Sequence, residues 1–296
     1  MAFDIKPIDP ATRAFFAGVV SGIDLTRRLS DEEVAAIHAG MDRFGMLVFH
    51  SQKLDDESQL AFSRQLGPLE TATGDIAAPE DRRIGMDLND ISNLDKHGKV
   101  VARDDRRRLF GLGNQLWHSD SSFKEVPAKY SLLSARQIPP SGGNTEFADM
   151  RAAYDALDEA TRREIHDLVC VHSQIFSRGI LGFDEFTEAE RQKWAPVRQR
   201  LVRRHPTTGR LSLYLASHAG GIEGWPVPEA RAFLRDLTEH ATQRPFVYAH
   251  VWKPWDLVMW DNRVTMHRAR RYDPNEVRDM RRTTLTNEVS SLEQAP

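Results

Sequence analysis

The chain has 296 residues, of which 40% are hydrophobic and 28% charged, and its formal net charge is −3 at pH 7. This is the composition of an ordinary globular protein, and the nearly balanced charge gives no reason to expect nucleic acid or an anionic membrane as a partner. The one cysteine, Cys170, excludes an internal disulfide and a cysteine-based zinc site. We find neither a signal-peptide pattern nor an 18-residue apolar run, and we therefore expect a cytoplasmic protein.

The first elements in the chain are two predicted helices with a short strand between them. Residues 30–43 have apolar positions at helical spacing, with Ser30 as the cap and Glu33 completing a capping box. Residues 46–49 predict a buried strand, and residues 55–66 predict a second helix that a Gly-Pro pair ends. We expect both helices to cover the outside of a sheet.

Residues 70–113 follow, and they are irregular, polar and rich in charge. Loops of this length in compact domains are usually functional or disordered. Because this loop runs directly into the predicted strand that holds His118, we interpret it as a lid or substrate loop.

The rest of the chain alternates short predicted strands with inserted helices. Strands are predicted at 129–135, 144–149, 211–215, 246–252, 257–260, 264–269 and 281–288, and helices at 151–168, 187–195 and 228–242. This pattern favours a mainly β protein with flanking helices, arranged as a jelly roll or a related barrel. No break in composition divides the chain, so we predict a single domain over residues 1–296.

Three residues predict a metal site. His118 and Asp120 are two positions apart, so in a strand both side chains would point to the same face. With His267 downstream, they complete the two-histidine, one-carboxylate set that holds non-haem Fe(II) and leaves coordination positions open. Such a set can bind a chelating cosubstrate and O₂, or it can hold zinc that activates water for hydrolysis. These three residues alone do not distinguish the two.

Three segments, in the right order, resemble the Fe(II)/2-oxoglutarate-dependent taurine/2,4-dichlorophenoxyacetate dioxygenase family. They are residues 117–123 (Trp-His-Ser-Asp-Ser-Ser-Phe), 140–150 (Pro-Ser-Gly-Gly-Asn-Thr-Glu-Phe-Ala-Asp-Met) and 260–268 (Trp-Asp-Asn, four residues, then His-Arg). The resemblance extends roughly from the first helix to residue 288. It is strongest to the phenoxyacetate-degrading members in residues 114–123, 150–157 and 239–244. It implies a double-stranded β-helix, which is a jelly roll.

The resemblance also implies roles for individual residues. The three metal candidates would hold Fe(II), and Thr145 and Arg278 would bind the distal carboxylate of the cosubstrate 2-oxoglutarate. Arg282 would bind the anionic head of the prime substrate, and on a strand Arg278 and Arg282 would share one face while Arg281 would point outward. Four further residues are candidate substrate contacts, namely Asn114, Ser122, Lys99 and His218.

The function implied is hydroxylation of an aryloxyalkanoate, such as 2,4-dichlorophenoxyacetate, at the carbon between the ether oxygen and the carboxylate. O₂ and 2-oxoglutarate would be consumed, giving a phenol and glyoxylate together with succinate and CO₂. The alternatives are a sulfonate or alkyl sulfate dioxygenase of the same family and, in another class, a zinc-dependent hydrolase. We also expect a homo-oligomer. Two departures from the family pattern are Trp255, where glycine is usual, and the absence of a lysine just after Glu70.

Overall fold

The computed structural model describes residues 3–12, 15–72, 76 and 79–294. Its strands are β1 (Asp4–Pro7), β2 (Gly18–Ser21), β3 (Met46–Phe49), β4 (Asn89–Asp90), β5 (Ala128–Gln137), β6 (Thr145–Asp149), β7 (Val169–His172), β8 (Val197–Arg200), β9 (Val202–Arg204), β10 (Leu211–Leu213), β11 (Ala219–Ile222), β12 (Val247–His250), β13 (Leu257–Asp261), β14 (Thr265–Ala269) and β15 (Asp279–Thr286). Its α-helices are α1 (Asp31–Phe44), α2 (Asp56–Leu66), α3 (Arg106–Gly111), α4 (Met150–Asp155), α5 (Glu159–Ile165), α6 (Gln174–Gly179), α7 (Glu188–Lys193) and α8 (Val227–Ala241). The 3₁₀ turns are η1 (Pro79–Asp81), η2 (Leu112–Gln115), η3 (Arg244–Phe246) and η4 (Ser291–Glu293).

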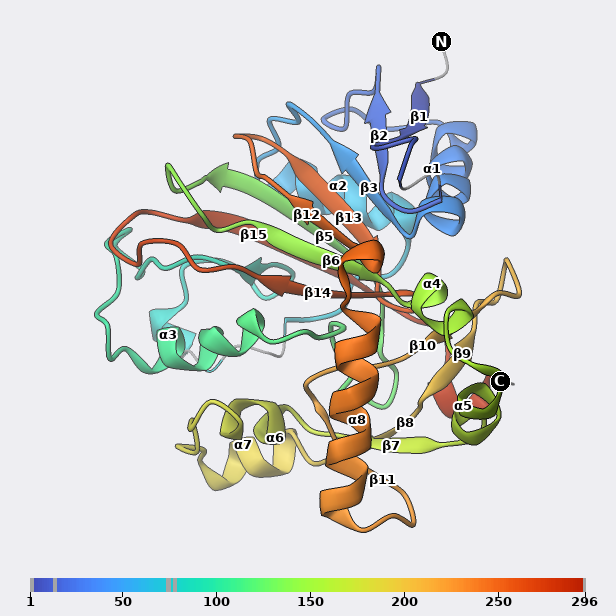
Figure 1. Ribbon diagram of the computed structural model, residues 1–296. Helices are drawn as coiled ribbons and strands as arrows, with labels where there is room; N and C mark the ends of the chain where they lie inside the picture. Colours follow the sequence, from blue (N-terminus) through green and yellow to red (C-terminus); the bar gives the residue numbers. More distant parts are fainter. Residues whose placement is uncertain (1–2, 13–14, 73–75, 77–78, 295–296) are drawn as a thin grey trace.

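Two sheets pack against each other at the centre of the molecule (Figure 1). The larger has seven strands in the order β1-β2-β3-β13-β5-β15-β4, and the smaller has three in the order β12-β6-β14. β2 pairs with β3 in parallel, whereas β3, β13, β5 and β15 pair antiparallel. Strands far apart in sequence are neighbours in both sheets, as in a jelly roll. The prediction of a mainly β jelly roll with flanking helices is confirmed.

Side chains point alternately to the two faces of the larger sheet along β13, and both faces are buried. Leu257 and Met259 point outward and pack beneath α1 and α2, whereas Val258 and Trp260 point into the space between the sheets. There the Trp260 ring lies 5.4 Å from the ring of Phe147 on β6. The two N-terminal helices therefore cover the outside of the sheet, as their amphipathic patterns predict.

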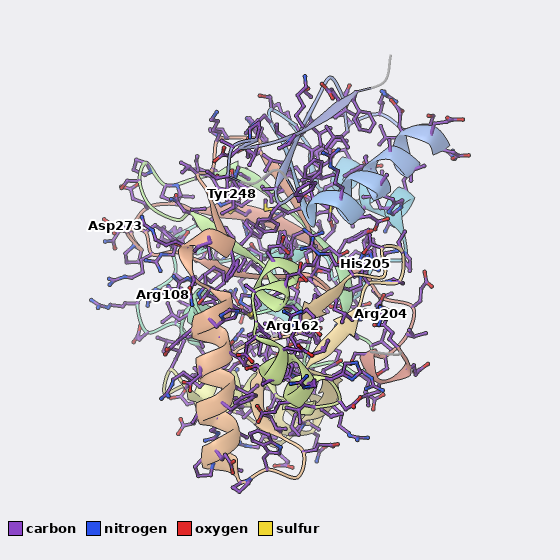
Figure 2. The ribbon with its side chains drawn as sticks, turned by 45° about the vertical axis from the view of Figure 1, so that its right-hand side comes forward. Arg108, Arg162, Arg204, His205, Tyr248 and Asp273 are labelled. Carbon is purple, nitrogen blue, oxygen red and sulfur yellow. The ribbon has the colours of Figure 1, made fainter. Side chains whose placement is uncertain are left out.

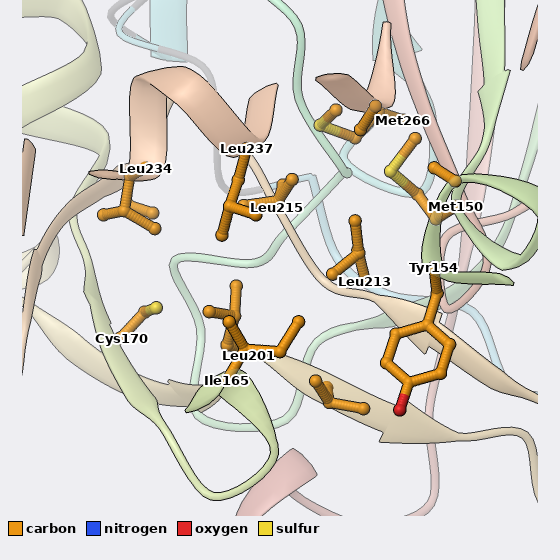
Figure 3. Close-up of a cluster of buried hydrophobic side chains, with 14 of the residues drawn as sticks. Met150, Tyr154, Ile165, Cys170, Leu201, Leu213, Leu215, Leu234, Leu237 and Met266 are labelled. Carbon is orange, nitrogen blue, oxygen red and sulfur yellow. The ribbon is translucent and has the colours of Figure 1, made fainter. Parts of the chain in front are cut away.

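A second core lies beneath α8, which crosses one side of the molecule (Figure 1). Leu234 and Leu237 of α8 pack over Cys170 of β7 and its apolar neighbours (Figure 3). Burial raises the pKa of the Cys170 thiol to about 12, so this cysteine is a buried structural side chain. His205, which follows β9, lies near α1 (Figure 2). Its Nε2 atom is 3.6 Å from a carboxylate oxygen of Asp42. Within the described ranges, no helix combines the length and apolarity that a membrane span requires.

Two departures from the predicted elements concern the surroundings of the metal site. Residues 70–113 are not wholly irregular, because they include η1, β4, α3 and the start of η2, while residues 73–75 and 77–78 of this loop lie outside the described residues. The strand expected at His118 is also wrong. His118 makes a single bridge to His267, and the extended run ends because Ser121 adopts a φ of +55°.

The turn before β13 accounts for one departure from the family pattern. Trp255, which stands where glycine is usual, has a φ of +66°, in the left-handed region that glycine adopts most easily. Two backbone hydrogen bonds hold this turn, from the Gln52 amide to the Trp255 carbonyl at 2.7 Å and from the Trp255 amide to the Ala135 carbonyl at 3.0 Å. The turn therefore keeps the glycine conformation although it carries a bulky side chain.

Candidate active site

The three predicted metal-binding side chains meet between the two sheets. One ligand atom from each of His118, Asp120 and His267 lies within 4.8 Å of the other two, and all three residues are buried. The Nε2 atoms of His118 and His267 lie 3.9 and 3.8 Å from the two carboxylate oxygens of Asp120. The structure therefore brings together residues that are up to 149 positions apart in the sequence.

Backbone pairing holds the two histidines together. His118 and His267 exchange amide-to-carbonyl hydrogen bonds of 3.0 and 2.8 Å, which places their rings 4.2 Å apart. The Nδ1–H of His118 donates to the Leu116 carbonyl at 2.7 Å, and this tautomer leaves Nε2 free to bind a metal. The ring of His267 packs against Trp260 and Phe147.

Asp120 is oriented by a hydrogen-bond network from the larger sheet. The Ser131 hydroxyl donates to one carboxylate oxygen at 2.7 Å, and Arg282 donates to the other at 2.5 Å. Asn262 fixes the backbone, because its Oδ1 accepts from the Asp120 amide at 3.0 Å and its Nδ2 donates to Ser131 at 3.0 Å. Trp260 Nε1 donates to the same Asn262 oxygen. The carboxylate is thus positioned before any ligand binds.

The protonation states suit a divalent metal. Burial lowers the pKa of the His118 imidazole, and burial together with the neighbouring His118 lowers that of His267 well below its usual value. Burial alone would raise the pKa of Asp120, but the positive charge of Arg282 and its other neighbours outweigh this and lower it to about 2. At neutral pH the site therefore offers two neutral imidazoles and one carboxylate, and this donor set fits Fe(II).

Arg278 is a buried guanidinium without an acidic partner in the described part of the chain. It is 6% exposed, burial lowers its pKa, and its Nη1 donates only to the Ile91 carbonyl at 3.3 Å. It lines a cavity of about 110 Å³ together with Trp252 and the turn 138–144. Trp252 Nε1 donates to the Thr145 hydroxyl at 3.0 Å, which leaves the hydroxyl proton available for a further acceptor.

Arg282 and Arg281 lie on opposite faces of β15, as strand alternation predicts. Arg282 faces the metal site and bonds to Asp120. Arg281 points away from the metal site, as expected, but it does not reach solvent, because it is 7% exposed and ion-pairs with Asp56 of α2 and with Asp279. The helix α2 covers that face, so an arginine there must be paired with carboxylates.

Comparison with known proteins identifies the family. The family model for taurine catabolism dioxygenase TauD, TfdA family, matches residues 4–284. The chain belongs to this family. Over 289 residues it is 46% identical to the alpha-ketoglutarate-dependent 2,4-dichlorophenoxyacetate dioxygenase of Cupriavidus pinatubonensis, with 98% of this chain and 99% of that protein covered. Over 300 residues it is 36% identical to the (S)-phenoxypropionate/alpha-ketoglutarate-dioxygenase of Sphingobium herbicidovorans, covering 98% and 97% of the two chains.

A solved structure extends the comparison. The crystal structure of AAD-2 in complex with Mn(II) and N-oxalylglycine is 55% identical in sequence and superimposes with a TM-score of 0.95, covering 98% of this chain and 100% of that one. The chain is therefore an enzyme, a 2-oxoglutarate-dependent dioxygenase whose His-Asp-His site fits Fe(II). This answers the open question between dioxygenase and zinc-dependent hydrolase in favour of the TauD, TfdA dioxygenases.

The four further substrate candidates lie in different surroundings. His218 is buried beside the metal site, with its ring 6.0 Å from that of His118 and 5.0 Å from that of Phe123. Asn114, on η2, accepts a hydrogen bond from Arg178 at 3.3 Å. The Ser122 hydroxyl lies 3.0 Å from His172 Nδ1, within a buried network. Lys99 is exposed in the turn that follows Asp95, and the structure does not bring it to the metal residues.

Three residues at the site were not predicted from sequence. Ser131 and Asn262 orient Asp120, and only the second lies in a motif that the family resemblance includes. Arg178, on α6, is 5% exposed and contacts the predicted candidate Asn114. No sequence signal marks Arg178, because it is a lone arginine in a short helix whose function depends on where the fold places it.

Proposed function

We propose that this dioxygenase hydroxylates an aryloxyalkanoate such as 2,4-dichlorophenoxyacetate next to the ether oxygen, releasing a phenol and glyoxylate. The observation that carries this proposal is the place of Arg282, which bonds directly to the metal-binding candidate Asp120. An acid held by this guanidinium has its carboxylate beside the metal site, so the adjacent carbon faces the oxidising centre. The named activities of the two phenoxy-acid dioxygenases that this chain resembles support the same substrate class.

Arg278 and Thr145 are proposed to hold the distal carboxylate of 2-oxoglutarate. A guanidinium forks onto a carboxylate through two parallel bonds, and these charge-assisted bonds are stronger than neutral ones. Arg278 is buried without an acidic partner in the described residues, so a bound dicarboxylate would balance its charge. N-oxalylglycine, which is bound in the AAD-2 crystal, differs from 2-oxoglutarate only by an NH in place of a methylene.

His118, Asp120 and His267 are proposed to hold the iron, which supplies O₂ activation and the oxidising power for breaking a C–H bond. The protein orients the reacting molecules and excludes water from the site. The Ser131 and Arg282 contacts keep the Asp120 carboxylate in one orientation, and the Leu116 carbonyl keeps His118 in one tautomer. The hemiacetal that hydroxylation leaves then collapses, because its C–O bond to the aryl oxygen breaks as the hydroxyl oxygen forms the glyoxylate carbonyl.

Residues 70–113 are proposed to act as a lid or substrate loop within one domain of residues 1–296. Asn93, in this loop, accepts from the Arg278 amide through Oδ1 at 2.9 Å, and its own amide donates to the Arg278 carbonyl at 3.2 Å. The loop therefore touches the proposed cosubstrate arginine directly. Lys99 and Ser122 stay predictions, Lys99 because it lies exposed on this loop and Ser122 because its hydroxyl is engaged with His172.

The cellular setting is also part of the proposal. We infer a cytoplasmic homo-oligomer, since the sole cysteine is a buried thiol and several large apolar side chains are exposed, including Phe15, Ile180 and Val251. The substrate is a small anionic molecule, and neither nucleic acid nor a membrane is expected as a partner. Sedimentation equilibrium of the purified protein checks the oligomeric state, and a pure monomer at micromolar concentration contradicts it.

The test of the substrate is a product assay. The Fe(II)-loaded enzyme is incubated with O₂, 2-oxoglutarate and 2,4-dichlorophenoxyacetate, and phenol, glyoxylate and succinate are quantified together. We expect the three products in equal amounts. Succinate formed with alkyl sulfonates or alkyl sulfates, but no phenol from any phenoxyacetate, would replace the aryloxy acid with the other anion class that Arg282 can bind.

A further inference from the structure

The metal site is bordered by a second buried arginine that the proposed mechanism has not used. Arg178 is 5% exposed, yet its guanidinium makes only two side-chain hydrogen bonds, both 3.3 Å long and both to neutral acceptors. These acceptors are the Ser177 hydroxyl and Asn114 Oδ1, and the Nε of Arg178 has no partner among the described residues. A buried guanidinium in this state lacks the carboxylate that normally accompanies it.

The surroundings of Arg178 hold it in place. The ring of Phe110 lies beneath the guanidinium, with the Arg178 Cζ atom 4.6 Å from the ring centre. The backbone of Gly113 lies so close that a Cβ at this position would be 2.2 Å from Arg178 Nη1 and 2.3 Å from Cζ. The glycine therefore makes room for the guanidinium, which is a sign of a built position rather than of a side chain filling a gap.

Two contacts connect Arg178 to the metal residues. The Ser177 hydroxyl that accepts from Arg178 lies 2.9 Å from His218 Nδ1, and the ring of His218 meets the ring of His118 edge to face. The positive charges of Arg178 and Arg282 also act on each other. Burial and repulsion from Arg282 together lower the pKa of Arg178 to about 10, so the guanidinium stays charged at neutral pH.

We propose that Arg178 is a specificity-determining residue that binds the anionic head of the prime substrate together with Arg282. The Nε–H of both arginines is unbonded among the described residues, but Arg282 has a carboxylate partner in Asp120, whereas Arg178 has no acidic partner there. A carboxylate between them would give Arg178 its missing partner and relieve the repulsion between the two cations. This inference rests on the proposed function, because it assigns an additional group to the same substrate.

The experiment measures equilibrium binding to the anaerobic Fe(II)–2-oxoglutarate enzyme, using the visible band of the cosubstrate chelate. In the wild type, 2,4-dichlorophenoxyacetate should shift this band. In Arg178→Gln we expect the Kd of the acid to rise roughly 10- to 100-fold, the loss typical of a charge-assisted hydrogen bond. The Kd of 2-oxoglutarate should stay unchanged, and Arg178→Lys should recover part of the affinity because it keeps the charge without the fork.

Two further variants separate recognition from structure. Gly113→Ala should also raise the Kd of the acid, because the added Cβ must displace the Arg178 guanidinium. Arg231→Gln is the matched control, since Arg231 stacks on Phe176 of α6, the helix that carries Arg178, but lies exposed on α8. It should leave the Kd of the acid unchanged. Each variant is first checked for folding by circular dichroism, and Arg178→Lys and Gly113→Ala carry the test if the glutamine variant does not fold.

A neutral ligand gives the deciding readout. The amide of the same acid lacks the anion, so its Kd should be nearly equal in the wild type and in Arg178→Gln. Equal weakening of acid and amide would make Arg178 a structural residue, and a raised Kd for 2-oxoglutarate alone would assign it to the cosubstrate. Either result overturns the proposal. A wild type that binds alkyl sulfonate but no phenoxyacetate would overturn the proposed substrate instead, and the Arg178 comparison would then be made with the sulfonate and its neutral sulfonamide.

Discussion

Asp261 and Arg263, at the end of β13, form a buried ion pair, whereas Arg278 and Arg178 are equally buried arginines with no acid beside them in the described residues. Arg263 donates to both oxygens of Asp261, at 2.9 and 2.6 Å, and both residues are almost fully buried. Arg278 and Arg178 instead bond only to a carbonyl, a hydroxyl and an amide oxygen. Arg263 thus has a carboxylate partner within the chain, whereas Arg278 and Arg178 have none among the described residues.

This difference separates two uses of a buried charge. A pair that the chain itself completes holds the fold together, and removing one member leaves the other buried and uncompensated. An arginine that the chain leaves incomplete can be completed by a ligand anion. The comparison therefore predicts opposite consequences for removing the two kinds of arginine, one on stability and the other on binding.

The largest expected effect is on stability, in Arg263→Ala. This change leaves the Asp261 carboxylate buried without its guanidinium, so the free energy of unfolding should fall by about 3–5 kcal/mol. Chemical denaturation followed by circular dichroism measures this loss. The KM for 2-oxoglutarate of the folded fraction should stay close to that of the wild type. A loss of less than about 1 kcal/mol in the free energy of unfolding would contradict the claim that this pair stabilises the fold.

The next effect is on binding, in Arg278→Ala. Losing the guanidinium should weaken the binding of 2-oxoglutarate by ~2–5 kcal/mol, which raises its KM roughly 30-fold or more. The free energy of unfolding of the ligand-free variant should be unchanged or higher, because an unpaired buried charge has been removed. Steady-state kinetics and denaturation on the same preparation check both. An unchanged KM for 2-oxoglutarate would contradict the cosubstrate assignment.

A smaller effect is expected from Ser131→Ala. The variant removes the hydroxyl that donates to Asp120 and leaves the three proposed metal ligands intact. Groups that orient a metal ligand typically contribute a factor of roughly 10–100 in metal affinity or activity. Fe(II) titration monitored by activity should show this loss, with Ser134→Ala of the same strand as the control. Equal Fe(II) affinity in wild type and Ser131→Ala would mean that Arg282 alone orients the carboxylate.

The smallest effect is the pH dependence of the Asp261 pair. Burial alone would raise the pKa of Asp261. The positive charge of Arg263, with the hydrogen bonds from Arg263 and His205, outweighs this effect and holds the pKa well below its usual range. The unfolded carboxyl protonates near pH ~3.9. The stabilisation is therefore present above this pH and is lost as the pH falls towards the folded pKa. Urea unfolding between pH 7 and 3 should show a steeper loss in the wild type than in Arg263→Ala, and parallel curves would contradict it.

The parts of this molecule that local chemistry determines could be predicted from sequence. The capping box of Ser30 and Glu33 is present at the start of α1, and the strands β5, β6 and β12 to β15 lie where the apolar patterns place them. The two-histidine, one-carboxylate set was also predictable from residue types, and its three members meet in the structure. The spacing of His118 and Asp120 predicts a shared strand face, but Asp120 lies in a turn and not on a strand.

Features that depend on distant partners could not be predicted. Strands β1, β2, β7 to β9 and β11 are short, and their pairing is decided by neighbours elsewhere in the chain. The burial of the outward-pointing Arg281 could not be predicted, because nothing local indicates that α2 covers it. Arg178 has no motif at all, and its significance comes from what it lacks: a carboxylate among the described residues that the fold places around it.

The most direct test of the account is a crystal structure of the Mn(II) complex with N-oxalylglycine and 2,4-dichlorophenoxyacetate. We predict that the distal carboxylate of N-oxalylglycine bonds to Arg278 and Thr145, and that the phenoxyacetate carboxylate lies within hydrogen-bond distance of both Arg282 and Arg178. Electron density that places either carboxylate away from these guanidiniums, with Arg278 or Arg178 still lacking an anion, would contradict the claim that unpaired buried arginines mark the ligand positions.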